Sequence, residues 1–283
     1  MAIRRILVPV EGSATGRTVF LTALEVARAH GAHVAAVHVR PDPRVGVPLI
    51  GEGMSAGMVE ELIALTEKET AARARDAKAM FDALHAQSGL PLASDPALSG
   101  ASVSWSSVDG REEEEIARRG RLADLIVLGR PSQQPDSDAT VIFNAALFET
   151  GRPVLVAPID ARPLGRRLAI AWNGSVEAAR AVHAAMDLLR QAETVTIVAA
   201  EPDRAIDADG SALVDYLNWH GIDSRLHALA EADSVGDAIA ATVAEADLVV
   251  MGAYSHSRLR ELILGGVTRH MLENTATALL MAH

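Results

Sequence analysis

The stretch Ala123-Asp124-Leu125-Ile126-Val127-Leu128-Gly129 returns later in the chain as Ala246-Asp247-Leu248-Val249-Val250-Met251-Gly252. Each copy is a short apolar run that ends in glycine. Such a run is typical of a buried parallel strand followed by a tight turn. Ligands of open α/β sheets bind beyond the carboxyl ends of the strands, so both glycines mark candidate ligand positions.

A second pair of stretches indicates that the whole chain is duplicated. Residues 6–13, Ile-Leu-Val-Pro-Val-Glu-Gly-Ser, correspond to residues 168–175, Leu-Ala-Ile-Ala-Trp-Asn-Gly-Ser. Similar segments in the same order predict two copies of one α/β domain. We expect domains at 1–160 and 166–283, joined by the short polar linker 160–165.

Strands alternate with helices in both copies, which predicts parallel sheets with helices on both faces. The order expected for each five-stranded sheet is 3-2-1-4-5. The last strands, 153–158 and 277–282, would then be apolar edges, and we expect them to pair antiparallel with each other. The expected strands are 3–10, 32–39, 101–108, 123–129 and 153–158, then 166–172, 193–200, 223–230, 246–252 and 277–282. The expected helices are 14–30, 58–88, 111–121 and 139–150, then 175–191, 209–221, 234–245 and 266–274.

Composition excludes several classes of function. The net charge of -11 disfavours nucleic acids and anionic membranes as partners. The chain has no cysteine, so disulfides, thiolate metal sites and a cysteine nucleophile are excluded. No apolar run approaches the roughly 18 residues of a membrane span. We expect a cytoplasmic protein that does not bind nucleic acid or membrane.

The second copy contains the sharpest motif. Gly252-Ala253-Tyr254-Ser255 is followed by nine residues and then by Gly265-Gly266-Val267-Thr268. Gly252 allows a close approach of ligand to backbone, and the two later glycines open a helix whose free N–H groups can hold a phosphate. This spacing resembles that of nucleotide-binding members of the universal stress protein family. With the order of the elements, the resemblance covers nearly the whole chain in a tandem form.

The resemblance implies two flavodoxin-like domains of the adenine-nucleotide-α-hydrolase type. It also implies a stress-response protein that senses ATP or another adenine nucleotide through domain 2, with no obligatory cofactor. The family's aspartate after strand 1 is replaced here by Asn173, which brings no charge, and Ser255 replaces the motif's second glycine. The nucleotide-binding candidates of domain 2 are Asn173, Ala200, Gly252, Ser255, Gly265, Gly266 and Val267.

The first copy of the motif is degenerate. Gly129-Arg130-Pro131-Ser132 is followed by only six residues before Ala139-Thr140, and an alanine stands where the helix-opening glycine belongs. The prolines of this loop remove N–H groups. We therefore do not expect domain 1 to bind nucleotide. Its corresponding positions are Glu11, Val39, Gly129, Ser132 and Thr140.

Other chemistry-bearing residues have simpler interpretations. The acids at 112–115 suit the first turn of a helix. His220 and His227 lack a third metal ligand at a recognisable spacing, and His256 lies beside the domain 2 loop. The segment Pro41–Gly57 suits a lid over the first site or a surface loop. We expect no metal site.

Three classes of function remain open. The first is the nucleotide sensor, and the second is a protein-interaction module that binds no nucleotide. The third is an enzyme of the wider superfamily, which the absence of a nucleophile–base pair disfavours. We expect no catalytic residues, an intramolecular pseudo-dimer of the two domains, a homodimer of such chains and a protein partner that the sequence does not identify.

Overall fold

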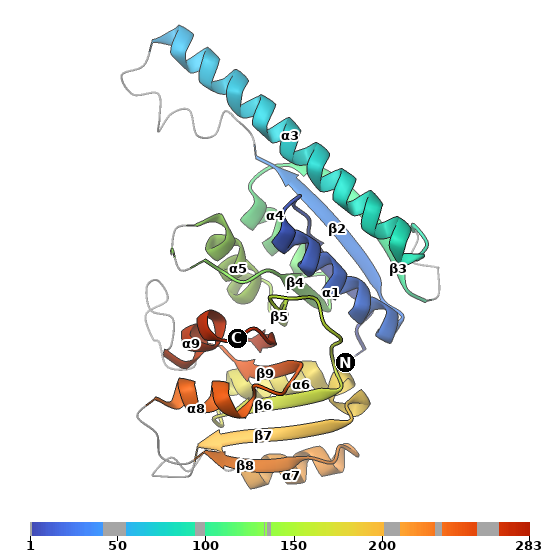
Figure 1. Ribbon diagram of the computed structural model, residues 1–283, viewed down its shortest axis with the longest axis vertical. Coiled ribbons are helices and arrows are strands. Elements are labelled where there is room, and N and C mark those ends of the chain that lie inside the picture. The colour runs from blue at the N-terminus through green and yellow to red at the C-terminus, as the bar shows by residue number, and fades with distance from the viewer. Residues whose placement is uncertain are drawn as a thin grey trace.

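The computed structural model describes residues 2–41, 55–93, 100–132, 134, 137–200, 210–229, 234–253 and 266–283. Within these residues, ten strands form one sheet in the order β3-β2-β1-β4-β5-β10-β9-β6-β7-β8 (Figure 1). Both halves of this sheet have the predicted order 3-2-1-4-5. The strands are β1 (Arg5–Pro9), β2 (His33–Arg40), β3 (Ser102–Asp109), β4 (Leu125–Leu128), β5 (Val154–Val156), β6 (Arg167–Trp172), β7 (Thr194–Ala200), β8 (Arg225–Leu229), β9 (Leu248–Gly252) and β10 (Ala278–Ala282).

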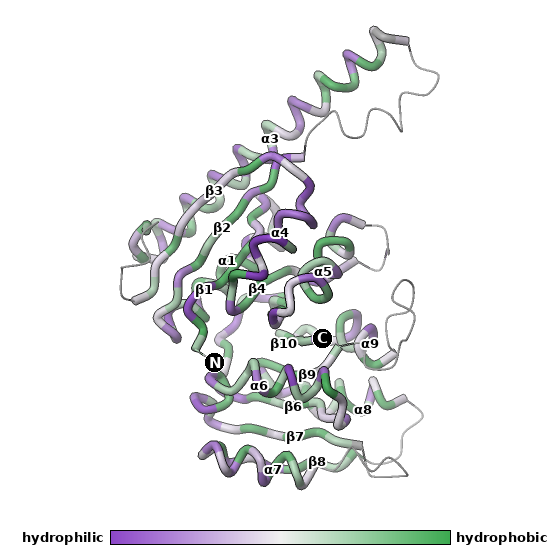
Figure 2. Tube along the Cα trace, turned by 180° about the vertical axis from the view of Figure 1, so that it is seen from behind, coloured by the Kyte–Doolittle hydropathy of each residue, from purple (hydrophilic) through white to green (hydrophobic). Residues whose placement is uncertain are grey.

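Helices cover both faces of the sheet, as predicted. One apolar layer lies under α1, α3, α6 and α7, and the other lies under α4, α5, α8 and α9. The inner strands of the sheet are apolar on both sides, which is the pattern of a buried parallel sheet, whereas the edge strands β3 and β8 expose polar side chains (Figure 2). The helices are α1 (Ala14–His30), α3 (Ala56–Ser88), α4 (Glu112–Gly120), α5 (Asp138–Glu149), α6 (Val176–Gln191), α7 (Gly210–Trp219), α8 (Val235–Thr242) and α9 (Gly266–Asn274).

The two halves meet through their fifth strands. β5 pairs antiparallel with β10, with Leu155 opposite Leu280, which confirms the predicted pairing. Both leucines are buried at 1% exposure or less. The linker is tied down beside this junction, because the backbone N–H of Leu164 donates to Glu25 on α1 at 2.9 Å. The pairing therefore removes both apolar sheet edges at once.

The aspartate of the repeated stretch has the same structural task in both halves. Asp124 accepts hydrogen bonds from the backbone N–H groups of Arg4 and Arg5, each at 2.9 Å. Asp247 accepts from the backbone N–H groups of Arg166 at 3.2 Å and Arg167 at 2.7 Å. Each aspartate thus satisfies the amides that lead into the first strand of its half. The aspartate of the repeated stretch is therefore explained by its hydrogen bonds to these backbone amides.

The segment before the long helix differs from the expectation. α3 begins at Ala56, where the Ser55 side chain caps it by accepting from the Met58 amide at 3.3 Å, so Gly57 belongs to the helix and not to a loop. The helix extends past the end of β2 (Figure 1). Residues 42–54, where we expected a lid or surface loop, lie outside the described residues. None of the helices that the structure describes is both long enough and apolar enough to cross a membrane.

Candidate functional site

A cleft of about 1070 Å³ opens at the carboxyl ends of β1, β2 and β4. The amino ends of α1, α4 and α5 point at it, and the side of α3 closes it. This is the switch point of the first half of the sheet, where ligands of such folds bind. The part of the chain described by the structure thus forms a ligand-sized cavity in the first half, where the sequence motif is degenerate.

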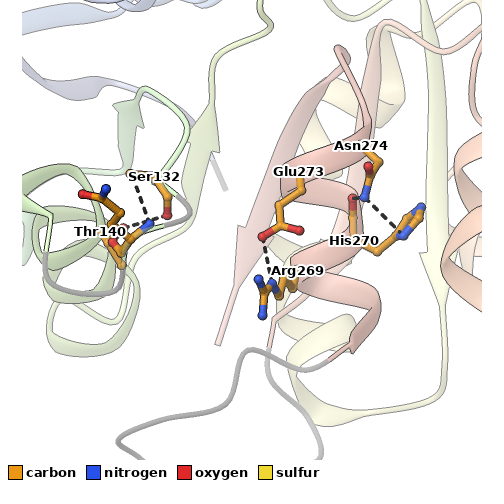
Figure 3. Close-up of polar contacts among 7 residues, drawn as sticks. Ser132, Thr140, Arg269, His270, Glu273 and Asn274 are labelled. Atoms are coloured by element: carbon orange, nitrogen blue, oxygen red, sulfur yellow. Dashed lines mark hydrogen bonds and ion pairs between the residues drawn. The ribbon is translucent and has the colours of Figure 1, made fainter.

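The predicted residues of the first copy divide into two groups. Glu11, Val39 and Gly129 line the cleft. Ser132 and Thr140 hold the loop instead: the Thr140 hydroxyl donates to the Ser132 carbonyl at 3.0 Å (Figure 3), and Thr140 is only 7% exposed. The serine and threonine therefore have a structural role that accounts for them without a ligand.

Carboxylates dominate the charge of the cleft. Glu112, at the start of α4, is partly buried there, and burial raises its pKa. The neighbouring carboxylates of Glu11, Asp138 and Glu113 also raise this pKa, which reaches about 7 with all causes together. Asp76 on α3 is a further carboxylate of the cleft. It lies close to the backbone of Gly12, and this approach is possible because Gly12 has no side chain: a Cβ there would lie 2.6 Å from the Asp76 Cβ. Such a cavity repels phosphate groups.

The acidic run at 112–115 is only partly explained by the helix dipole. Glu113 and Glu114 pair with Arg111, at 2.5 and 3.2 Å. Hydrogen bonds from Arg118 and Arg119 hold the pKa of Glu115 below its ordinary value. Glu112 differs from these three because it makes no ion pair within the described residues. The helix α4 is mostly hydrophilic (Figure 2), apart from the buried Ile116 and Ala117.

Arg111 and Arg130, which line the cleft, are engaged with other groups. Arg111 pairs as described above, whereas the exposed Arg73 has only a loose contact of 3.9 Å with Glu69. Arg130 points across the junction and donates to the carbonyls of Met271 at 3.3 Å, Leu272 at 2.7 Å and Thr277 at 2.5 Å. Burial lowers its pKa to about 10, so it stays charged at neutral pH. It thus joins the first half to the carboxyl end of α9, where a cation is favoured by the helix dipole.

A buried histidine forms part of the cleft wall. His38 is 7% exposed, and its Nδ1 donates to the carbonyl of Val10 at 2.9 Å. Trp105 stacks on its ring with 6.1 Å between the ring centroids. In the neutral imidazole the other nitrogen, Nε2, is then a hydrogen-bond acceptor. Nε2 is buried and has no partner among the residues that the structure describes.

The second half carries the fuller motif, and the structure describes part of it. Asn173 follows β6 and accepts from the Ser175 amide at 3.1 Å. Gly252 ends β9 against the start of α6, where a Cβ would lie 2.7 Å from the Glu177 carbonyl carbon. This contact gives Gly252 a packing role besides the ligand role predicted for it. Ser255, Gly265, His256 and the side chain of Ala200 lie outside the described residues.

The start of α9 differs electrostatically from the start of α5. α9 begins at Gly266 with no acidic residue in its first turn, whereas the first turn of α5 contains Asp138. Gly266 is exposed, and a Cβ there would meet nothing within 4 Å. Val267 packs partly buried against the apolar layer. The first N–H groups of such a helix can hold an anion.

The rest of α9 is held by local polar contacts (Figure 3). Glu273 accepts from Arg269 at 2.8 Å, and Asn274 donates to the His270 carbonyl at 3.2 Å. His270 also lies 3.2 Å from Asp237 on α8. These contacts fix the helix whose amino end is the predicted phosphate position.

Sequence reasoning missed three residues of the first cleft. Glu112 is one of four adjacent glutamates, so its sequence position does not distinguish it from the others. Arg130 lies in the degenerate copy of the motif, where no ligand contact was expected. The only signal for His38 was its position near the end of the second strand. The histidines at 220 and 227 do not form a metal site with their neighbours: within the described residues, no group of three ligating side chains could hold a metal ion. His220 instead contacts the Tyr216 ring, with 4.7 Å between centroids.

Comparisons with known proteins agree with this architecture. The sequence profile of the universal stress protein family matches residues 2–139 and 191–283. A universal stress protein from Archaeoglobus fulgidus DSM 4304 is 16% identical with a TM-score of 0.65, over 98% of this chain and 95% of that one. A functionally unknown protein from Pseudomonas aeruginosa PAO1 is 17% identical with a TM-score of 0.58, over 99% of this chain and 92% of that one.

No curated protein matches the sequence. The two structural likenesses extend over nearly all of this chain and show the shared fold. The matched profile covers segments in both halves, which agrees with the duplicated strands and with the aspartate that is repeated in each half. The chain therefore belongs to the universal stress protein family, in a tandem form.

Proposed function

We propose that this protein is an adenine-nucleotide sensor whose nucleotide site lies in a second domain, residues 166–283. A first domain, residues 1–160, has lost that site in this proposal. The observation that carries it is the contrast between the two helix starts. The first turn of α9 has no acidic residue, and the residue after β6 is the neutral Asn173, whereas α5 begins with Asp138 near Glu11 and Glu112. A triphosphate is attracted to the first environment and repelled by the second.

Other groups support the same site. The indole N–H of Trp172, the last residue of β6, is buried and has no partner among the described residues. The ring packs partly buried against the apolar layer. In the proposal Asn173 and Ala200 contact the nucleoside, and Gly265, Gly266 and Val267 present backbone N–H groups to the phosphates, with Gly252 and Ser255 at the turn.

The test is calorimetric titration of ATP into the full-length protein and into Gly266→Asp. The position has room for the new side chain, and an acid in the first helical turn favours the fold. We therefore expect an unchanged or higher melting temperature and at least a tenfold weaker affinity for ATP. Asp138→Asn, at the matching position of α5, is the control and should leave ATP binding unchanged.

Undiminished ATP affinity in Gly266→Asp would contradict the proposal, and so would a loss of affinity in the control. No binding by the unaltered protein would favour the interaction module that binds no nucleotide. The proposal also includes a non-catalytic role, a cytoplasmic location and a homodimer of tandem chains. Light scattering and cell fractionation test the last two.

A further inference from the structure

We propose that the first part of α3 binds the same helix of a second copy of this chain, in antiparallel orientation. The inference rests on the homodimer that the proposed function includes, and it assigns the surface that forms that dimer. This surface, the outer stripe of α3, consists of Met58, Glu61, Leu65, Lys68, Ala72 and Arg75. The outer stripe lies in the first half, away from the nucleotide site proposed for the second.

The first part of α3 lies outside the core of the first half. Among the described residues of this helix, the buried apolar side chains are Ala77, Phe81 and Leu84, all in its second part. The amino end of the helix projects past the end of β2 (Figure 1, Figure 2). Helices in water gain most of their stability from packing of an apolar face. Packing against the core therefore does not explain why α3 is so long.

The outer stripe is open to solvent and partly apolar. Met58 is 53% exposed and Leu65 is 55% exposed. The three charged residues of the stripe are exposed as well, and Ala72 is partly exposed. At 3.6 residues per turn, the stripe lies on the side of the helix opposite Ala77, where α3 enters the core. An exposed apolar stripe on a projecting helix is a candidate contact surface.

The spacing of the stripe is that of a helix–helix seam. Steps of three and four residues alternate from Met58 to Arg75, with apolar side chains at positions 58, 65 and 72 and charged ones at 61, 68 and 75. This is the heptad spacing of a coiled coil, in which polar residues on the seam fix register and orientation. The seam is about 26 Å long at 1.5 Å per residue.

The charged residues of the stripe have no partner on their own helix. No residue of opposite charge stands three or four positions from Glu61, Lys68 or Arg75. The three lie two turns apart, which is about 10 Å, and they make no ion pair within the described residues. Elsewhere on α3 such pairs do form, since Lys78 lies 2.6 Å from Asp82. The stripe thus presents unpaired charges of both signs.

A second, antiparallel copy of the helix would supply the missing partners. With a twofold axis between Leu65 and Lys68, Glu61 of each copy lies within one turn of Arg75 of the other. In the same register the aliphatic stems of Lys68 and Arg75 cover Leu65 and Met58. The twofold axis forms each contact twice. A parallel pair would instead place every charge beside its own equivalent.

The other charges of α3 favour the same orientation. Residues 56–67 contain three glutamates and no basic residue, whereas residues 68–78 contain four basic and two acidic residues. Antiparallel pairing places the acidic part of each helix against the basic part of the other. It also keeps the cores of the two copies at opposite ends of the seam, because each core contacts α3 only from Ala77 onwards. The charge pattern therefore selects a second copy as the partner.

Sedimentation equilibrium of the full-length protein tests the proposal. We expect a dimer whose dissociation constant rises at least tenfold in Glu61→Arg and in Arg75→Glu, because each substitution brings like charges together. The double variant Glu61→Arg/Arg75→Glu restores opposite charges, so its dissociation constant should return to within threefold of the original. Glu60→Arg is the matched control: it makes the same charge change on an exposed residue outside the stripe, and the dissociation constant should change less than threefold.

Three results would overturn this interface. They are a monomeric unaltered protein, single variants that dimerise as tightly as the unaltered protein, and a double variant that dimerises no better than the single ones. A monomer would contradict the proposed homodimer as well. A dimer that none of these substitutions weakens would contradict only the assignment to α3, so the two failures are distinguishable.

Discussion

Glu112→Gln should make the protein more stable at alkaline pH, although it removes a charged residue. Burial and the carboxylates of Glu11, Asp138 and Glu113 raise the pKa of Glu112 in the folded protein from 4.5 to about 7. Between these two values the folded protein binds more protons than the unfolded chain. Stability therefore falls as the pH rises through this window, and the loss is complete above the folded pKa.

The size of the effect follows from that difference in pKa. It corresponds to about 3 kcal/mol at pH 8 and to less than about 1 kcal/mol at pH 5, where the carboxyl is largely protonated in the folded protein. The neutral amide removes this cost. We expect Glu112→Gln to gain about 2 kcal/mol more at pH 8 than at pH 5.

Urea denaturation at the two pH values measures this gain. The fluorescence of Trp105, which packs against Phe81 in the first half with 4.9 Å between ring centroids, contributes to the signal. Glu114→Gln, on the same helix with its side chain 65% exposed, is the control, and it should change stability by less than about 0.5 kcal/mol at either pH. A gain that is equal at the two pH values, or one that the control reproduces, would refute the reasoning.

Two further predictions concern the junction between the halves. Arg130→Met leaves the carbonyls of Met271, Leu272 and Thr277 without their charged donor, so urea denaturation should show a loss of about 2 kcal/mol; unchanged stability would mean that water replaces the guanidinium. Leu155→Pro removes a ladder amide from β5 and uncovers both sheet edges. Calorimetry should show lower melting temperatures for both halves together with aggregation, and a shift confined to one half would argue against the shared sheet.

The sequence was sufficient to predict the architecture. The informative patterns are local: apolar runs that end in glycine, alternation of strands with helices, and the repeated Ala-Asp-Leu stretch. Such apolar strands are buried efficiently in a parallel sheet with helices on both faces. Even the antiparallel contact of β5 with β10 followed from the need to cover an apolar edge strand beside a short linker. The bounds of α3 were less predictable, because its cap at Ser55 lies in a segment without a clear period.

The chemistry of the first cleft was decided only by tertiary structure. In the sequence Glu112 is one of four adjacent glutamates, and its raised pKa arises because the fold buries it near Glu11 and Asp138. The hydrogen bonding of His38 is decided in the same way, because the Val10 carbonyl pairs with one ring nitrogen and the packing leaves the other without a partner among the described residues. Strand and helix patterns depend on neighbours along the chain. Charge, desolvation and hydrogen-bond satisfaction depend on neighbours in space, and only the folded chain brings those together.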